Sequence, residues 1–194
     1  MKNKSTKYYI IALLLVLLDQ ASKLHFKSHL SYGEVMPIIG NFLSFTYIEN
    51  QGMAFGITFG WGKIFLSLFS LIASGVICYG IYKFRDKLPL VVGIAASLIL
   101  AGAFGNSIDR CFYGVIFGTD PLFYGRVVDF ILVDIPDIDF LWLHYTYFPV
   151  FNIADSCVTC GVVLLLLMHK QILFLENNSE NGMENSVENK TDDE

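Results

Sequence analysis

Four long apolar stretches constrain this chain more than any other feature of its sequence. They cover approximately residues 8–26, 63–82, 89–108 and 150–169. Each is long enough for a helix to cross the apolar core of a bilayer, which takes about 20 residues at about 1.5 Å each. Since 54% of the residues are hydrophobic and only 16% are charged, we expect an all-α membrane protein built as a four-helix transmembrane bundle.

The first apolar stretch has a second interpretation, as a signal peptide that is cleaved. Lys2, Lys4 and Lys7 precede the apolar run, as they would in such a peptide. The run ends in Asp19-Gln20-Ala21-Ser22-Lys23, however, which offers no good small-x-small cleavage site. We therefore favour a retained helix.

The basic residues of the short connections predict the orientation of the helices. Lysines precede the first stretch, Lys83, Arg85 and Lys87 lie between the second and third, and Lys170 follows the fourth. Because short cytoplasmic loops hold the excess of Lys and Arg, both termini are predicted to be cytoplasmic. The long connections, roughly 27–62 and 110–149, then face the other side. The first contains a predicted hairpin, residues 34–39 and 42–48 around Gly40-Asn41, which would form a small extracytoplasmic β-sheet beside the outer loops.

The C-terminal segment differs in composition from the rest of the chain. Residues 176–194 carry seven acidic residues, one lysine and no aromatic residue. Such a segment cannot bury enough apolar surface to offset the entropy of ordering. We expect a polytopic membrane domain over residues 1–170 and a disordered acidic cytoplasmic tail over 171–194.

Polar residues gather at the predicted outer ends of the apolar stretches. An acidic residue at the centre of a transmembrane helix costs on the order of 3 kcal/mol, so convergence at one depth on several helices predicts a site. Spacings of three and four residues place the members of each pair on one helix face. Helix caps and interhelical hydrogen bonds of a purely structural bundle are equally consistent with this spacing. The residues are Asp19, Lys23, Asn106, Asp109, Arg110, Asn152 and Asp155.

The chemistry available to such a site is that of carboxylates. The sequence has no HExxH, GxSxG or P-loop motif, and Cys157-x-x-Cys160 lies in an apolar run that we interpret as helix. Asp129 lies in an apolar segment on the same predicted side as Asp155. If they meet, they would provide the acid and base pair of an aspartic peptidase. The pattern alone does not distinguish Asp129 from the other acidic residues of this loop, Asp120, Asp134, Asp137 and Asp139.

Five separated blocks of sequence resemble the lipoprotein signal peptidase family, also called signal peptidase II. They occur in the family's order and together span most of residues 8–170. The blocks are Asp19-Gln20-Ala21-Ser22-Lys23, Asn50-Gln51-Gly52-Met53-Ala54-Phe55-Gly56, Gly102-Ala103-Phe104-Gly105-Asn106-Ser107-Ile108-Asp109-Arg110, Val127-Val128-Asp129-Phe130 and Phe151-Asn152-Ile153-Ala154-Asp155.

The resemblance implies roles for ten residues. It makes Asp129 and Asp155 the catalytic dyad, and it makes the other eight substrate-binding or supporting residues: Asp19, Lys23, Asn50, Gly52, Asn106, Asp109, Arg110 and Asn152. It also implies a hydrolase of the bacterial cytoplasmic (inner) membrane. Such an enzyme cuts a precursor lipoprotein just before a cysteine that bears a diacylglyceryl group.

The same resemblance sets our expectations for partners and for the loops. We expect a monomer whose partners are lipid-modified precursors and membrane lipid, without nucleic acid, metal or cofactor. Two segments, 117–125 and 134–147, are longer than the family usually has. We expect both to form outer loops over the site, rich in aromatic residues such as Phe140, Trp142, Tyr145 and Tyr147.

Two other classes of protein place acidic residues in membrane helices. A transporter or proton-conducting bundle would distribute its acidic residues through the depth of the membrane, whereas here they gather at one end. An assembly or scaffold protein would use the polar residues only to join helices, so a single Asp to Asn change would destabilise the bundle or have no effect.

Overall fold

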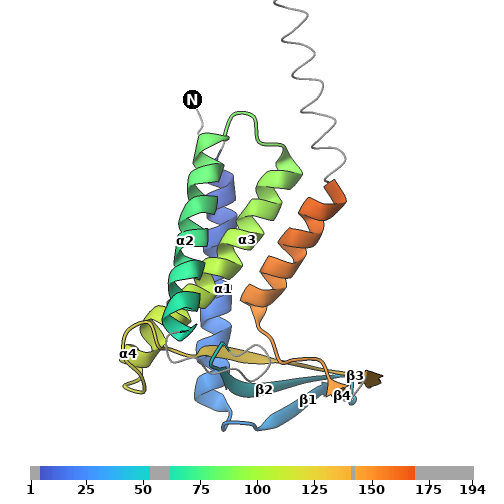
Figure 1. Ribbon diagram of the computed structural model, residues 1–194. Coiled ribbons are helices and arrows are strands. Elements are labelled where there is room, and N and C mark those ends of the chain that lie inside the picture. Colours follow the sequence, from blue (N-terminus) through green and yellow to red (C-terminus); the bar gives the residue numbers. More distant parts are fainter. Residues whose placement is uncertain (1–4, 53–61, 141–142, 169–194) are drawn as a thin grey trace, which may run out of the picture.

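The computed structural model describes residues 5–52, 62–140 and 143–168. Helices α1 (Thr6–His29), α2 (Gly62–Lys83) and α3 (Leu90–Ile108) run side by side, and a further helix, Ile153–Met168, lies next to α3 (Figure 1). By length and composition, α1, α2 and the stretch Leu90–Ile116 can each cross a membrane. Three of the four predicted apolar helices are thereby confirmed, and their crossing of a membrane stays a prediction. The helix Ile153–Met168 is apolar but shorter in its described part, so the fourth span stays a prediction.

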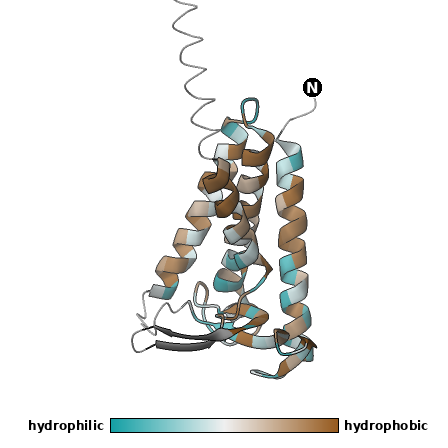
Figure 2. Cartoon of the chain, turned by 90° about the vertical axis from the view of Figure 1, so that its right-hand side faces the viewer, coloured by the Kyte–Doolittle hydropathy of each residue, from teal (hydrophilic) through white to brown (hydrophobic). Residues whose placement is uncertain are grey.

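Hydrophobic residues make up most of the length of the helices (Figure 2), and many of them are exposed. Only 22% of the apolar window of α1 and 17% of that of α2 is buried, against 50% for Leu90–Ile116. Leu14 of α1 and Ile72 of α2 are 59% and 65% exposed. Exposed apolar area of this extent suits hydrocarbon as the surrounding solvent. It also identifies α3 as the central helix of the group.

Helix α3 packs closely on its neighbours through small residues. Ser97, Ala101 and Gly105, which place a small residue at every fourth position, are buried, and Ala101 belongs to a core cluster with Ala12 and Val16 of α1. On another side of α3, the position of a Cβ atom at Gly102 would overlap the carbonyl oxygen of Ala154. Small residues therefore let two helices approach the backbone of α3, as they do in membrane bundles generally.

The third apolar helix does not end where the sequence predicted. Beyond Ile108 it continues as a π-helical turn, η1 (Asp109–Tyr113), and a short helix, α4 (Gly114–Ile116). A π-helical turn inserts an extra residue into the helical ladder and is frequent at functional sites. Here it contains Asp109 and Arg110, which the sequence had placed just outside the helix.

A small antiparallel sheet lies across one end of the helices, opposite the connection between α2 and α3 (Figure 1). Strands β1 (Val35–Ile39) and β2 (Leu43–Asn50) form the predicted hairpin, with Gly40 at a φ of 50° in the turn. Strand β3 (Val127–Phe140) pairs with β2, and β4 (Leu143–Tyr147) pairs with the far half of β3. The sheet order is β1-β2-β3-β4.

The two long segments differ from the expected loops over the site. Residues 117–125 fold back onto the end of the third helix, where the backbone N–H of Gly125 donates to the carbonyl of Arg110 at 2.9 Å and that of Phe123 to Cys111 at 3.2 Å. Residues 134–147 are not a loop, because their described backbone belongs to β3 and β4. The β-branched and aromatic residues of this segment suit strands. Trp142 lies outside the described residues.

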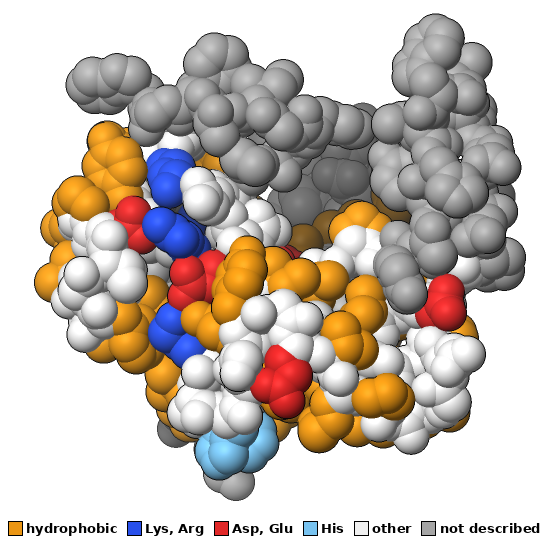
Figure 3. Space-filling model, turned by 90° about the horizontal axis from the view of Figure 1, so that it is seen from below, with side chains coloured by type: hydrophobic (Ala, Val, Ile, Leu, Met, Phe, Trp, Pro, Cys, Tyr) orange, Lys and Arg blue, Asp and Glu red, His pale blue; other side chains and the backbone are white. Residues whose placement is uncertain are grey.

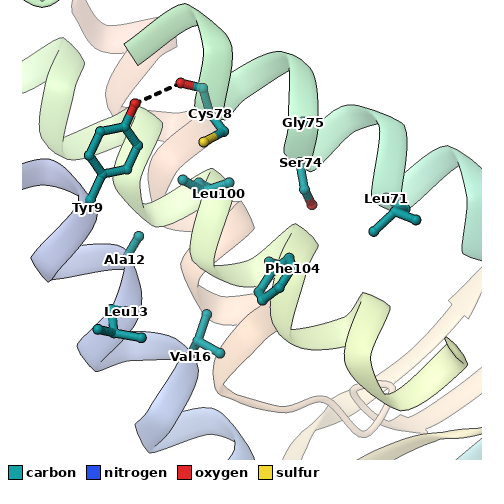
Figure 4. Close-up of a pocket in the computed structure, with 10 residues that line it drawn as sticks. All are labelled: Tyr9, Ala12, Leu13, Val16, Leu71, Ser74, Gly75, Cys78, Leu100 and Phe104. Carbon is teal, nitrogen blue, oxygen red and sulfur yellow. Dashed lines mark hydrogen bonds between the residues drawn. The ribbon is translucent and has the colours of Figure 1, made fainter. Parts of the chain in front are cut away.

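A cavity within the helix group is apolar and separate from the polar residues at the helix ends. It has a volume of about 520 Å³ and lies between α1, α2 and α3, with Val16, Leu71, Leu100 and Phe104 in its wall (Figure 4). The hydroxyl of Tyr9 at its edge donates to the carbonyl of Cys78 at 2.9 Å. Its lining has no acidic or basic side chain. The candidate chemistry must therefore be sought elsewhere, at the helix ends.

Candidate active site

Lys23 is the centre of the polar cluster. Its side chain is 0% exposed, yet its ammonium group has three partners, which equals the number of its N–H donors. The Nζ atom lies 2.9 Å from Asp19 Oδ2 and 3.0 Å from Asp109 Oδ2, and it donates to Asn106 Oδ1 at 2.9 Å. A buried charge is tolerated only with such pairing. Lys23 thus fixes the relative positions of α1, α3 and η1.

Asp19 extends this contact to the last described helix. While its Oδ2 atom faces Lys23, its Oδ1 atom accepts a hydrogen bond from the backbone N–H of Ala154 at 2.9 Å. The first turn of a helix has N–H groups without intrahelical partners, and a carboxylate there is favourable. A Cβ atom at Gly105 would lie 2.8 Å from Asp19 Oδ2. Glycine at this position is therefore what gives the carboxylate its room.

Asp109 holds the beginning of β3. Its Oδ2 atom accepts from the backbone N–H of Val128 at 3.1 Å, next to the ion pair with Lys23. Its Oδ1 atom accepts from the side-chain amide of Gln20 at 2.9 Å. The hydroxyl of Tyr113 in turn donates to the Gln20 carbonyl oxygen at 3.1 Å. The residue before Asp129 is consequently anchored to two helices.

Asn152 and Asp155 form a reciprocal cap at the start of the helix Ile153–Met168. The backbone N–H of Asp155 donates to Asn152 Oδ1 at 2.9 Å, and the backbone N–H of Asn152 donates to Asp155 Oδ2 at 3.2 Å. This is the geometry of a capping box with Asn as N-cap and an acidic residue three positions later. The cap orients the Asp155 carboxylate toward the helix end, where the other polar residues lie.

Asn106 joins Asp155 to the buried lysine. Its amide nitrogen donates to Asp155 Oδ1 at 2.8 Å, and its carbonyl oxygen accepts from Lys23 and, at 3.2 Å, from Asn152. Both oxygens of Asp155 therefore have a donor. This arrangement leaves the side chain little rotational freedom.

Asp129 lies on β3 and is 2% exposed. Its Oδ1 atom accepts from Asn152 Nδ2 at 2.7 Å and its Oδ2 atom from Asn50 Nδ2 at 3.0 Å. Burial, and then the charge of Asp155, raise the pKa of Asp129 to about 7, although the two amide hydrogen bonds act in the opposite direction. Asn152 thus bridges the two acids, its side chain to Asp129 and its backbone to Asp155.

The remaining predicted residues lie at the edge of this cluster. Asn50 ends β2, and its side-chain oxygen accepts from the backbone N–H of Gly52 at 2.9 Å. Gly52 has a φ of 76°, which favours glycine. Arg110 donates to the hydroxyl of Ser70 in α2 at 3.1 Å, and its charge acts on both Asp155 and Asp129. Met53 to Gly56 of the second sequence block lie outside the described residues.

The structure brings nine of the ten predicted site residues into one hydrogen-bonded chain, from Asp19 to Gly52. Arg110 contacts α2 instead. Sequence reasoning missed Gln20 and Tyr113, which bridge α1 and η1. Gln20 follows Asp19 and belongs to the first sequence block, so its position could have indicated a role in the site. Nothing in the sequence indicated that Tyr113 would face Gln20.

Metal and thiol chemistry gain no support from the arrangement. Within the described residues, no three His, Cys, Asp or Glu side chains are placed to hold a metal ion. The rings of His25 and His29 stack on each other with centroids 4.3 Å apart at the end of α1. Cys157 and Cys160 are free thiols on the helix Ile153–Met168.

The fold and the site together define an integral membrane protein with two carboxylic acids, one on β3 and one at the start of the helix Ile153–Met168, that are bridged by the hydrogen bonds of Asn152. The model of the family "Signal peptidase (SPase) II" matches residues 11–171. The chain belongs to this family.

Individual proteins agree with this assignment. A lipoprotein signal peptidase of Chromobacterium violaceum is 35% identical over 163 residues, covering 82% of this chain and 88% of its own length. One from Porphyromonas gingivalis is 36% identical over 194 residues, with 86% and 85% covered. Two solved bacterial membrane enzymes superpose with TM-scores of 0.64 at 34% and 32% identity. They cover 83% and 90% of this chain, and the match covers 90% of each of them.

Proposed function

We propose that this protein is an aspartic endopeptidase that removes the signal peptide from diacylglyceryl-modified prolipoproteins by cutting before the lipidated cysteine. Family membership supports the substrate class. The observation that carries the aspartic mechanism is the bridge through Asn152, whose side-chain amide contacts Asp129 at 2.7 Å and whose backbone amide contacts Asp155 at 3.2 Å. The two acids are held in fixed relation although 26 positions separate them in the sequence.

The proposed chemistry requires one proton on the pair. At about 4 Å and an effective dielectric constant of about 20, two carboxylates repel by about 4 kcal/mol, or roughly three pKa units. A pKa of about 7 for Asp129 lets this residue keep the proton near neutral pH. The ionised partner takes a proton from water, which attacks the scissile carbonyl, while the protonated acid donates to the carbonyl oxygen.

The buried ion pairs supply the rigidity that this chemistry needs. Lys23 connects to Asp155 through Asn106, and Asp109 holds the backbone just before Asp129. Both acids are thus attached to one lysine that is itself fully buried. Such fixed geometry lowers the cost of bringing water and substrate together. We assign Arg110, at the edge of the cluster, to hydrogen bonding of the substrate backbone.

The proposed location of the site is the extracytoplasmic boundary of the bacterial inner membrane. The basic connection between α2 and α3 lies at the opposite end from the sheet (Figure 1), so the positive-inside rule supports cytoplasmic termini and an outer site. At such a boundary, acyl chains enter from lipid while water reaches the acids from outside. We further propose that a single chain suffices for activity.

A reconstituted cleavage assay tests this function. The purified protein in lipid bilayers is given a precursor peptide with or without the diacylglyceryl group, and mass spectrometry identifies the products. We expect cleavage of the lipidated peptide before its modified cysteine and little cleavage of the other. Equal rates on both peptides would refute the substrate preference, and no cleavage of either would refute the proposed function.

A further inference from the structure

We propose that Glu49 is a positioning residue that holds Asn50 against Asp129. This inference rests on the proposed function, because it assigns Glu49 an effect on cleavage that acts through Asn50. Glu49 lies outside the set of site residues identified above, and in the part of the chain that the structure describes its side chain contacts Lys27, Tyr47 and Arg126 and neither of the two acids.

Glu49 and Asn50 lie on opposite faces of the sheet. Successive side chains of a strand alternate between its faces. In the pairing of β2 with β3, Asn50 is opposite Val127 and Ile48 is opposite Asp129, so Asn50 and Asp129 share a face. Glu49 points to the other face together with Tyr47. Contacts that hold the Glu49 side chain therefore hold the end of β2 from the face opposite to Asn50 and Asp129.

The side chain of Glu49 connects three elements. Its Oε1 atom lies 2.5 Å from Lys27 Nζ of α1 and accepts from the hydroxyl of Tyr47 at 2.5 Å. Its Oε2 atom lies 3.5 Å from the guanidinium of Arg126, immediately before β3. Lys27 also donates to Tyr47 at 2.6 Å. Helix α1, the end of β2 and the start of β3 thus meet at one carboxylate.

The cluster is charge-balanced and shielded from water. The side chains of Glu49 and Lys27 are 16% and 17% exposed, and Arg126 is paired in addition with Asp120 at 3.2 Å. Burial alone would raise the pKa of Glu49, but the hydrogen bonds from Lys27 and Tyr47 and the charges of Lys27 and Arg126 together outweigh burial and hold this pKa below its usual value. Seen from the sheet end, the visible basic side chains lie on one side of the molecule, with acidic side chains beside them (Figure 3). With two positive and two negative charges, the cluster joins elements and is unsuited to bind an anion.

Asn50 needs such a support because it is the last residue of β2. Strand ends fray more readily than strand centres. Within the described residues, Asn50 contacts the two acids through one hydrogen bond, which its amide donates to Asp129 at 3.0 Å. Loss of the Glu49 contacts with Lys27, Tyr47 and Arg126 would let this end of β2 move. The Asn50 amide would then no longer donate to the Asp129 carboxylate.

Steady-state cleavage of the lipidated precursor by a Glu49→Ala variant tests the proposal. We expect kcat to fall by about tenfold to a hundredfold, as for a small misplacement of a reacting group, while KM changes by less than about twofold. The hydrogen bond from Asn50 lowers the pKa of Asp129. Its loss should therefore move the high-pH limb of the activity profile to higher pH. Asp155, Lys23 and Arg110 also act on Asp129 electrostatically, and the substitution leaves all three in place.

A double-substitution cycle separates positioning from general damage. If Glu49 acts through Asn50, the combined variant Glu49→Ala/Asn50→Ala should match Asn50→Ala alone within about twofold, since coupled residues are not additive. Multiplicative losses, an unchanged kcat or a change confined to KM would each overturn the proposal. Glu34→Ala serves as a matched control, because Glu34 is an exposed acid beside β1 that caps only the backbone N–H of Ser31.

The variant Glu49→Gln covers the case in which Glu49→Ala does not fold. Its amide oxygen still accepts from Lys27 and Tyr47, so a smaller loss of kcat and the same direction of the pH shift are expected. An activity profile identical to the wild type would contradict the proposal. If the wild-type protein itself does not cleave the lipidated precursor, the proposed function has failed, and that result is distinct from a failure of this inference.

Discussion

Asp19 in α1 accepts a hydrogen bond from the backbone N–H of Ala154, 135 positions later in the chain, at 2.9 Å. The first helix therefore adds an acceptor to the cap that Asn152 and Asp155 form at the start of the helix that carries Asp155. Because the same carboxylate also pairs with Lys23, folding of the bundle and orientation of the proposed dyad depend on one buried network.

Replacement of Lys23 by Met tests how much this network contributes to the stability of the protein. The substitution would leave Asp19 and Asp109 buried without their cation, and removal of one partner of a buried pair costs about 3–5 kcal/mol. We expect the free energy of unfolding, measured by denaturation in detergent micelles, to fall by this amount. Lys87→Met, at an exposed position, should leave it nearly unchanged. Equal stability of the two variants would be inconsistent with the network described above.

The raised pKa of Asp129 predicts how activity depends on pH. A carboxyl group with a pKa of about 7 keeps its proton below this pH and loses it above. Since the mechanism needs one proton on the pair, kcat/KM should decrease as the pH rises through about 7, and it should also decrease in acid when the pair takes up a second proton. An activity that keeps rising with alkalinity would exclude Asp129 as the proton donor.

Gly102 tests the contact between α3 and the helix Ile153–Met168. A Cβ atom at this position would overlap the carbonyl oxygen of Ala154, and overpacking of this kind costs about 1–3 kcal/mol. We expect Gly102→Ala to lower both the midpoint of thermal unfolding and the cleavage rate. Gly80→Ala in α2 is the control, because nothing lies within 4 Å of its new Cβ atom. Equal unfolding midpoints and cleavage rates of the two variants would show that α3 and the helix Ile153–Met168 do not approach each other this closely.

Reporter fusions test the orientation of the helices. A reporter inserted after Lys87 should be active on the cytoplasmic side, and one inserted at Gly118 in the connection between α4 and β3 should be active outside. The reverse pattern would place the two acids on the cytoplasmic side and remove the proposed route of the substrate.

The sequence predicted the helices better than it predicted the site. The apolar stretches predicted three helices to within a few residues, because a helix that crosses lipid needs a long apolar run. Pairing of Asp19 with Lys23 followed from a spacing of four. The dyad was different, because residue patterns alone left Asp129 among several acids of one loop, and only the resemblance to a known family singled it out.

The contacts that the sequence did not predict depend on long-range strand pairing. Asp129 meets Asn50 only because β2 and β3 pair in one register, and the positions of Glu49 and Arg126 depend on the same pairing. Residues 134–147 were expected to form a loop, but their described backbone belongs to β3 and β4. Strand formation depends on pairing partners that tertiary structure sets, so the local sequence did not reveal these strands. The π-helical turn likewise begins at Asp109, whose contacts with Lys23 and Gln20 of α1 and with Val128 of β3 no local pattern encodes.

The most direct test of the account is the activity of Asp129→Asn and Asp155→Asn. Each variant removes one ionisable carboxyl group, and thermal unfolding in detergent would verify that the protein still folds. We expect folded proteins in which cleavage of the lipidated precursor falls to the background rate. Substantial cleavage by either folded variant would contradict the claim that these two acids share the proton transfers of the reaction.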